Sequence, residues 1–312
     1  MKLVFMGTPE FAVPSLERLV YSEHTVVGVV TVPDKPAGRG QKLRPSAIKR
    51  VALDFDLPIL QPEKLRDPQF VGELSAWNAD LFVIVAFRIL PEIVYTLPPK
   101  GTFNLHASLL PKYRGAAPIN WVLINGEQET GLTTFFLNKT VDTGDILLQR
   151  RIPITEEMTA GELHDLLALR GAELVLETVN GIVSNTLIPQ QQVGDATLAP
   201  KLTKELEQID WLKGAREIHN LVRGLSPLPG SVTKFRGKLI KILRTAMNGA
   251  GTHSVGPGTI TRIGKNGPID VQTGDGIISV LRLKPEGKKS MSAAEFIRGA
   301  RIEPGEKFGS SE

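Results

Sequence analysis

The segment FNLHASLLPKYRGAAP, residues 103–118, holds the residue types with the clearest capacity for chemistry. Asn104 and His106 are two positions apart, so on a strand their side chains share one face. An amide can donate a hydrogen bond to an oxyanion, and a histidine, which titrates near neutral pH, can move a proton. This pair is the minimum set for acyl transfer. Taken alone, a histidine at a strand end is more often structural.

A second candidate is the loop VDTGD at Val141–Asp145, which precedes a predicted strand. A carboxylate there could reach His106 across the sheet edge, select its tautomer and favour its protonated form. Asp and Gly also build ordinary turns, which is the alternative reading. Spacing alone leaves the choice between Asp142 and Asp145 open.

The third candidate is the loop PDKPAGRGQKLRP, residues 33–45, which carries four cationic side chains. Arg39 lies between two glycines and so has freedom to swing. The loop is either a solvated charged loop or an arm that binds phosphate. Its cationic residues are Lys35, Arg39, Lys42 and Arg44.

Short apolar runs alternate with helix-like stretches over the first 110 residues, which predicts an open, doubly wound, mostly parallel α/β sheet. Ligands of such sheets bind beyond the carboxyl ends of the strands. The turn Gly7–Glu10 holds only one glycine of the dinucleotide fingerprint, which argues against a nicotinamide enzyme. The predicted strands are Lys2–Met6, Thr25–Val32, Leu81–Ala86 and Thr102–Leu105, and the predicted helices are Glu10–Ser22, Ser46–Phe55 and Phe70–Trp77.

Two further strands and a long helix are expected to complete this domain, at Thr130–Phe136, Asp145–Ile152 and Ala160–Asn180. Periodicity then fades, so we place domain boundaries at 1–188 and 208–312, with a linker at 189–207. After the helix Ala215–Arg223, short strands alternate with Gly- and Pro-rich turns, which predicts a small OB-like β-barrel. The strands are Ser231–Phe235, Leu239–Leu243, Gly258–Ile263, Ile269–Gln272 and Ile277–Leu281.

Charge is distributed unevenly along the 312 residues. Residues 1–200 carry 18 Lys and Arg against 22 Asp and Glu, whereas residues 201–312 carry 19 against 11. The C-terminal part is therefore basic by 8 charges. Such asymmetry indicates contact with a polyanion, although a basic surface kept for solubility explains the charge equally well.

Composition argues against a metalloprotein, a secreted protein and a membrane protein. The chain has no cysteine, and its five histidines show no paired ligand spacing, so we expect no metal site. The apolar N-terminus breaks at Gly7 and Pro9, too early for a secretory signal, and no apolar run approaches the roughly 20 residues of a membrane span. We expect a cytoplasmic protein with no membrane partner.

Taken together, these segments resemble the folate-dependent formyltransferases. The resemblance rests on HASLLPKYRGAAP with Asn104 before it, on DTGD, on the glycine-flanked arginine and on KLTKE and IDW within Lys201–Trp211, and it covers essentially the whole chain. Ala86–Ile89 departs from it, because an aromatic-Gly pair is expected there. The resemblance implies that Asn104, His106 and Asp142 are catalytic, that Ser108, Leu109, Leu110 and Pro111 bind folate, and that Arg39 engages the tRNA acceptor end.

The activity implied by the resemblance is transfer of a formyl group from 10-formyltetrahydrofolate to the amino group of methionyl initiator tRNA. We expect a monomer. Phosphates of the tRNA would contact basic residues of the barrel and the Arg39 loop. A folate-dependent enzyme for a small-molecule amine and a non-catalytic RNA-binding protein are the alternatives. The expected tRNA contacts are Lys35, Arg39, Lys42, Arg44, Lys234, Arg236, Lys238 and Lys241.

Overall fold

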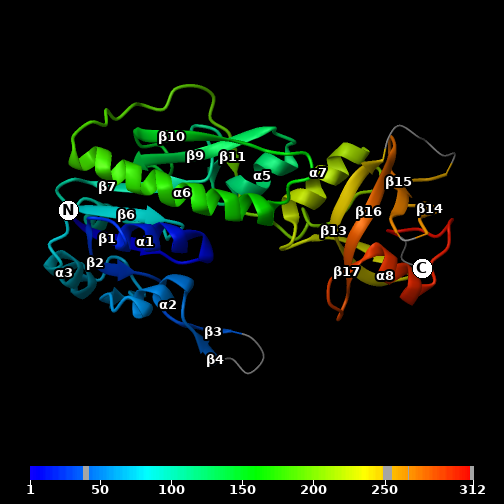
Figure 1. The fold of residues 1–312 in the computed structure, drawn as a ribbon, viewed down its shortest axis with the longest axis horizontal. Coiled ribbons are helices and arrows are strands. Elements are labelled where there is room, and N and C mark those ends of the chain that lie inside the picture. The colour runs from blue at the N-terminus through cyan, green and yellow to red at the C-terminus, as the bar shows by residue number, and fades with distance from the viewer. Residues whose placement is uncertain (38–41, 249–254, 266, 310–312) are drawn as a thin grey trace. The chain divides into compact units, whose positions relative to one another are not determined.

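The computed structural model describes residues 1–37, 42–248, 255–265 and 267–309 (Figure 1). The chain divides into two compact units. The first unit comprises Met1–Gly115, Thr130–Pro153 and His164–Ala199. The second unit comprises Ala116–Glu129, Ile154–Leu163 and Pro200–Glu312. Two internal segments therefore belong with the C-terminal part of the chain.

A seven-stranded sheet forms the centre of the first unit, in the order β10-β9-β7-β6-β1-β2-β5. The neighbours from β7 to β5 pair in parallel, whereas β7 and β9 pair antiparallel. The predicted mostly parallel sheet is confirmed. Its strands are β1 Lys2–Gly7, β2 Thr25–Val30, β5 Ile59–Leu60, β6 Leu81–Val85, β7 Thr102–His106, β9 Glu129–Phe136 and β10 Ile146–Pro153.

Helices cover both faces of this sheet. On one face, an added Cβ at Gly171 of α6 would meet Leu105 of β7 at 2.6 Å. On the other face, side chains of α3 and α4 pack with Ile84 of β6 in one apolar cluster. The sheet is therefore covered on both faces, as the unbroken apolar run LFVIV of β6 requires. The helices are α1 Val13–Val20, α2 Ala47–Asp54, α3 Pro68–Ala76, α4 Glu92–Tyr95 and α6 Ala160–Val183.

Local sequence explains where these helices begin. The expected helix 10–22 is divided into a 3-10 turn, Glu10–Ala12, and α1, which has Pro14 in its first turn. The Ser46 side chain caps α2 by accepting from the Lys49 amide at 3.0 Å.

Within the described part of the chain, none of the helices combines the length and hydropathy of a membrane span.

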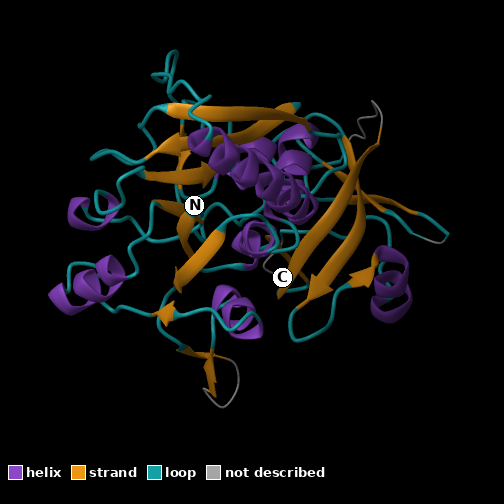
Figure 2. Ribbon diagram, turned by 60° about the vertical axis from the view of Figure 1, so that its left-hand side comes forward, coloured by secondary structure: helices purple, strands orange, loops and turns teal. Residues whose placement is uncertain are grey.

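An antiparallel sheet forms most of the second unit, in the order β12-β13-β16-β15-β14, with β17 on β16. The long strands β13 and β16 lie side by side (Figure 2). Five predicted strands are all present. The elements are β12 Ser231–Phe235, β13 Lys238–Asn248, β14 Ile260–Ile263, β15 Ile269–Gln272, β16 Ile277–Pro285, β17 Met291–Ser292, α5 Pro118–Ile124, α7 Ala215–Leu225 and α8 Ala293–Ala300.

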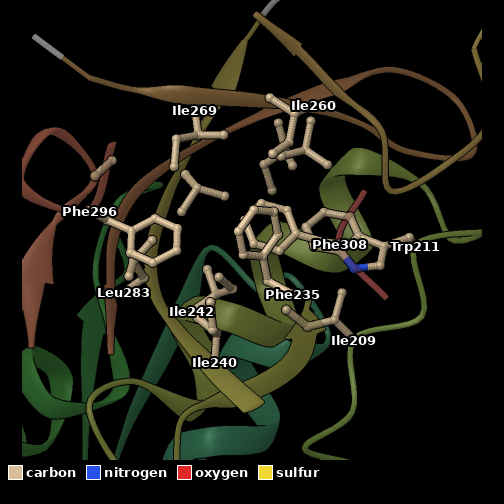
Figure 3. Close-up of a cluster of buried hydrophobic side chains, with 14 of the residues drawn as sticks. Ile209, Trp211, Phe235, Ile240, Ile242, Ile260, Ile269, Leu283, Phe296 and Phe308 are labelled. Atoms are coloured by element: carbon tan, nitrogen blue, oxygen red, sulfur yellow. The ribbon is translucent and has the colours of Figure 1, made fainter. Parts of the chain in front are cut away.

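The C-terminal segment 305–309 joins the two outer strands of this sheet. Gly305 and Glu306 bond to Ile260 of β14, and the Gly309 amide donates to the Lys234 carbonyl of β12 at 2.8 Å. The sheet is thereby closed into a barrel, which satisfies backbone groups that an edge would leave open. Figure 3 shows its apolar interior, where the rings of Phe235 and Phe308 lie 5.3 Å apart between centroids.

The segment expected to be a linker, 189–207, has little regular structure. Its exception is β11, Leu198–Ala199, which pairs in parallel with β8, Arg114–Gly115. An added Cβ at Gly115 would lie 2.8 Å from the Ala199 carbonyl oxygen, so β11 requires glycine opposite it.

Candidate active site

Strand β7 delivers Asn104 and His106 to the carboxyl edge of the sheet. Asn104 pairs with Ile84 of β6 and Phe135 of β9, and His106 pairs with Thr133 of β9. Side chains two apart on a strand share a face, and here it is the face of Ile84 that packs with α3 and α4. The side chain of Asn104 is half-buried and that of His106 is buried.

A hydrogen bond on one ring nitrogen and a carboxylate near the other orient His106. Its Nε2 bonds to the Tyr113 carbonyl at 2.8 Å, and because a carbonyl only accepts, Nε2 must carry hydrogen and donate. Its Nδ1 lies 3.8 Å from Oδ2 of Asp142. We expected the carboxylate to select the tautomer, but the Tyr113 carbonyl does so. The Asp142 carboxylate instead faces the opposite ring nitrogen.

The structure distinguishes the two acids that spacing left open. Asp142 has a left-handed backbone, φ 55°, and its Oδ2 accepts a hydrogen bond from the Gly115 amide at 2.9 Å. Asp145 is exposed, and its backbone carbonyl bonds to the Phe136 amide. Between them, an added Cβ at Gly144 would overlap the Phe136 carbonyl oxygen, which explains the glycine of DTGD. Asp142 is therefore the carboxylate beside His106.

The stretch Ser108–Pro111 is held against the sheet by a buried threonine. Thr133 Oγ1 donates to the Ser108 carbonyl at 2.7 Å and accepts from the Leu110 amide at 3.1 Å. The Ser108 hydroxyl donates to the Lys112 carbonyl at 2.6 Å. Ser108 and Leu110 are buried, whereas Leu109 and Pro111 are half-buried. The polar groups of this stretch are thus bonded within the protein, and Leu109 and Pro111 present its accessible surface.

A cavity of about 580 Å³ is lined by the segments that follow β5, β6 and β9 in sequence. Its volume is within the range of small-molecule sites. Arg88 lines it and donates to the carbonyls of Glu63 at 3.0 Å and Pro62 at 2.8 Å, while burial lowers the pKa of its guanidinium. Its Nε is buried without a hydrogen-bond partner. The lining residues are Glu63, Leu65, Arg66, Arg88, Ile89, Leu90, Pro91, Glu92, Tyr95 and Lys139.

The loop predicted at residues 33–45 includes a β-hairpin, β3 Lys35–Ala37 and β4 Lys42–Arg44, which projects from the first unit (Figure 1). Arg39 lies outside the described residues. Lys35 pairs with Arg44 across the hairpin, and both are exposed. At its base, Asp34 accepts from Lys49 at 2.7 Å and from Gln61 at 2.8 Å, and these hydrogen bonds lower the pKa of the Asp34 carboxyl.

Cationic side chains line the outer face of the barrel strands. Lys241 of β13 lies directly opposite Lys284 of β16, and Lys234 of β12 shares that face because its partner, Leu239, is two residues from Lys241. Lys234 and Lys284 are exposed. Like charges placed opposite each other repel, so this face favours an anion. Lys284 was missed from the sequence because its pairing with Lys241 depends on strand register.

Other predicted cations of the barrel have partners within the protein. Arg236 donates to both carboxylate oxygens of Glu306, at 2.6 and 2.9 Å, and this hydrogen bonding raises the pKa of its guanidinium. The Lys241 ammonium donates to the Pro229 carbonyl at 2.6 Å. Lys238, at the start of β13, is exposed.

Among the described side chains, no three His, Asp or Glu residues gather as metal ligands would.

Family models match both parts of the chain. The model described as formyl transferase matches residues 1–179, and the model described as formyl transferase, C-terminal domain, matches residues 201–301. A methionyl-tRNA formyltransferase of Azobacteroides pseudotrichonymphae genomovar. CFP2 is 49% identical over 96% of this chain and 95% of its own length. That of Bacteroides thetaiotaomicron is 46% identical over 99% and 98%, respectively.

Solved structures share the fold. HypX from Aquifex aeolicus in complex with tetrahydrofolic acid has a TM-score of 0.65 and 17% identity, over 95% of this chain and 47% of its own. A methionyl-tRNA formyltransferase from Clostridium thermocellum has a TM-score of 0.55 and 16% identity, over 80% of this chain and 94% of its own.

Proposed function

The chain belongs to the formyl transferase family, and on that premise we propose that it transfers the formyl group of 10-formyltetrahydrofolate to the amino group of methionyl initiator tRNA. The family resemblance found in the sequence is confirmed. The observation that carries the specific activity is identity of 46–49% over nearly the full length of both chains with methionyl-tRNA formyltransferases. The reaction supports initiation of translation.

The arrangement of Asn104, His106 and Asp142 suits attack on a formyl carbon. The nucleophile is an α-amino group, whose ordinary pKa of about 7.7–8.0 leaves an appreciable neutral fraction at neutral pH. The amine nitrogen forms a bond to the formyl carbon, and the bond from that carbon to the folate nitrogen breaks. Orientation and proton handling are therefore the tasks left to the protein.

Each of the three side chains has a distinct role in this proposal. The Asn104 amide donates to the oxyanion that develops on the formyl oxygen, a contact worth about 3–4 kcal/mol in comparable sites. His106 either donates to the same oxyanion or passes a proton from the attacking ammonium to the leaving nitrogen. Asp142 stabilises positive charge on the ring through its position 3.8 Å from Nδ1.

The cavity near Arg88 fits the folate substrate. Folates carry glutamate carboxylates, and Arg66, Arg88 and Lys139 place three cations in the lining against two acids. Lys139 is paired with Glu92 at 3.3 Å, which leaves Arg66 and Arg88 against the single carboxylate of Glu63 in the lining. An anionic ligand would compensate that imbalance. Leu109 and Pro111, the accessible part of the predicted folate stretch, supply apolar surface at the neighbouring strand end.

The cationic barrel face fits the tRNA backbone. Lys234, Lys241 and Lys284 come from three adjacent strands and share one outer face. Phosphates of an RNA strand would relieve the repulsion between Lys241 and Lys284. The exposed pair Lys35 and Arg44, which pair across β3 and β4, would add further contacts to the tRNA.

The two alternatives are not favoured. A non-catalytic RNA-binding protein has no need for a histidine fixed between a carbonyl and a carboxylate. Specificity for a small-molecule amine would leave the basic C-terminal unit unexplained, and the relatives whose names state tRNA match that unit as well. We propose a monomer, acting in the cytoplasm where initiator tRNA is used.

A formylation assay tests the proposal. The purified protein is expected to transfer formyl from 10-formyltetrahydrofolate to charged initiator tRNA and not to free amines. His106→Ala should lower kcat by about 100-fold or more while the Kd for tRNA stays near the wild-type value. His164→Ala, which removes a half-buried imidazole of α6 that packs against the Phe11 ring, is the matched control and should keep wild-type kcat. Wild-type turnover in His106→Ala would exclude the assigned role.

A further inference from the structure

Two short loops hold the groups that surround His106. The loop 113–115 supplies the Tyr113 carbonyl and the Gly115 amide, and the loop 142–144 supplies the Asp142 carboxylate. Asp142 sits in a left-handed backbone conformation beside the exposed Val141. The distance from Asp142 to the imidazole therefore depends on whatever fixes these loops to each other.

Besides the hydrogen bond from the Gly115 amide to Asp142, the side chain of Gln192 joins the two loops. Oε1 of Gln192 accepts from Nε and Nη2 of Arg114, at 3.2 and 2.6 Å. Nε2 of Gln192 donates to the carbonyls of Asp142 and Gly144, at 3.0 and 2.9 Å. A guanidinium can only donate and a carbonyl can only accept, so the chemistry of the partners defines which end of the amide faces which loop.

The backbone around Gln192 is anchored on both sides. Gln190 exchanges two hydrogen bonds with Ile146 of β10, at 2.7 and 2.9 Å. Thr197 accepts from the Tyr113 amide through its hydroxyl and from the Arg114 amide through its carbonyl, both at 2.9 Å. Gln192 is thus held between a strand on one side and the 113–115 loop on the other.

We propose that Gln192 is a positioning residue, which sets the separation of Asp142 and His106 by bonding the 142–144 loop to Arg114. The inference rests on the proposed formyl transfer and adds a residue to it from the segment that sequence patterns marked only as a linker. Without the Gln192 amide, the carbonyls of Asp142 and Gly144 lose this donor, and the 142–144 loop keeps fewer hydrogen bonds to hold its position. A displacement of about 1 Å in a reacting group can lower a rate about 100-fold.

Two substitutions of Gln192 change either one end or both ends of its side-chain amide. Gln192→Glu keeps oxygen acceptors for Arg114 but places a carboxylate against two carbonyls. Gln192→Ala removes both ends. We expect kcat to fall about 10- to 100-fold in both variants, with KM for tRNA and folate changed less than about threefold. Gln191→Ala is the matched control, because Gln191 is exposed and forms none of these bonds; it should keep wild-type kcat.

A double-mutant cycle with Asp142→Asn tests whether Gln192 acts through Asp142. If it does, Gln192→Ala combined with Asp142→Asn should be no slower than Asp142→Asn alone. A general loss of structure would instead lower Tm and reduce kcat by independent factors that multiply. Wild-type kcat in Gln192→Glu, or multiplicative effects in the cycle, would overturn the assignment. Absence of formyl transfer by the unaltered protein would contradict the proposed function instead.

Discussion

Gly115→Ala perturbs the site through the backbone alone. Gly115 has φ 123°, a conformation that residues with a Cβ rarely adopt, and the added atom would lie 2.8 Å from the Ala199 carbonyl oxygen. Its amide donates to Oδ2 of Asp142 at 2.9 Å. The variant must either keep this backbone under strain or rotate it and misdirect the amide away from Asp142.

Each course has a calculable effect. Strain at such a position costs about 1–3 kcal/mol of folding free energy, which lowers Tm by roughly 2–4 °C per kcal/mol in a domain of this size. Rotation removes a hydrogen bond to a carboxylate, worth about 1.5–3 kcal/mol. If Asp142 stabilises charge on His106 only during the reaction, the same loss lowers kcat by about 10- to 150-fold.

Steady-state formylation and thermal unfolding, measured on the same preparation, decide between these courses. Gly72→Ala is the matched control, because Gly72 lies in α3 with no atom within 4 Å of an added Cβ. That variant should gain about 0.5–1 kcal/mol and keep wild-type kcat. If Gly115→Ala kept both the wild-type Tm and the wild-type kcat, the proposed link from Gly115 to Asp142 would be refuted.

Three further perturbations probe the hairpin base, the barrel and the cavity. Lys49 lowers the pKa of Asp34, so this pair stabilises the fold above about pH 4, and the stabilisation is lost as pH falls through the pKa of Asp34 in the folded protein. Plots of Tm against pH for wild type and Lys49→Met should therefore converge below the pKa of Asp34 and separate above it, and parallel plots would contradict this. Lys284→Ala should reduce the slope of log Kd for tRNA against log salt by about 0.7–0.9, and an unchanged slope would place the RNA elsewhere. Arg66→Ala should raise KM for the folate several-fold with kcat retained, and an unchanged KM would remove the cavity from the folate site.

Sequence patterns predicted the elements of both units because burial imposes periodicity on each strand and helix. The unbroken run LFVIV marks β6 as covered on both faces, and Lys241 between the buried Ile240 and Ile242 marks β13 as covered on one. The sequence did not predict the 3-10 turn before α1, which has Pro14 in its first turn, or the helices α4, α5 and α8. The hairpin at 35–44 was missed because its charged strands have no apolar alternation.

Part of the candidate site was readable in the same way. Asn104 and His106 share a face because they are two apart on one strand, which is a local property of the chain. The choice of Asp142 over Asp145 came from the family resemblance, and its physical basis lies in Gly115 and Gly144, which hold the turn in place. No pattern within Val141–Asp145 records those contacts.

The sequence by itself determined the strand that carries the histidine and the basic C-terminal part, since each depends on residues close in the chain. Only the tertiary structure decided that the Tyr113 carbonyl selects the tautomer, that Gln192 joins the loops at 114 and 142–144, and that Lys284 faces Lys241. These contacts join residues brought together by sheet order and strand register. Local patterns specify which face of an element is buried, but not which distant polar group meets it.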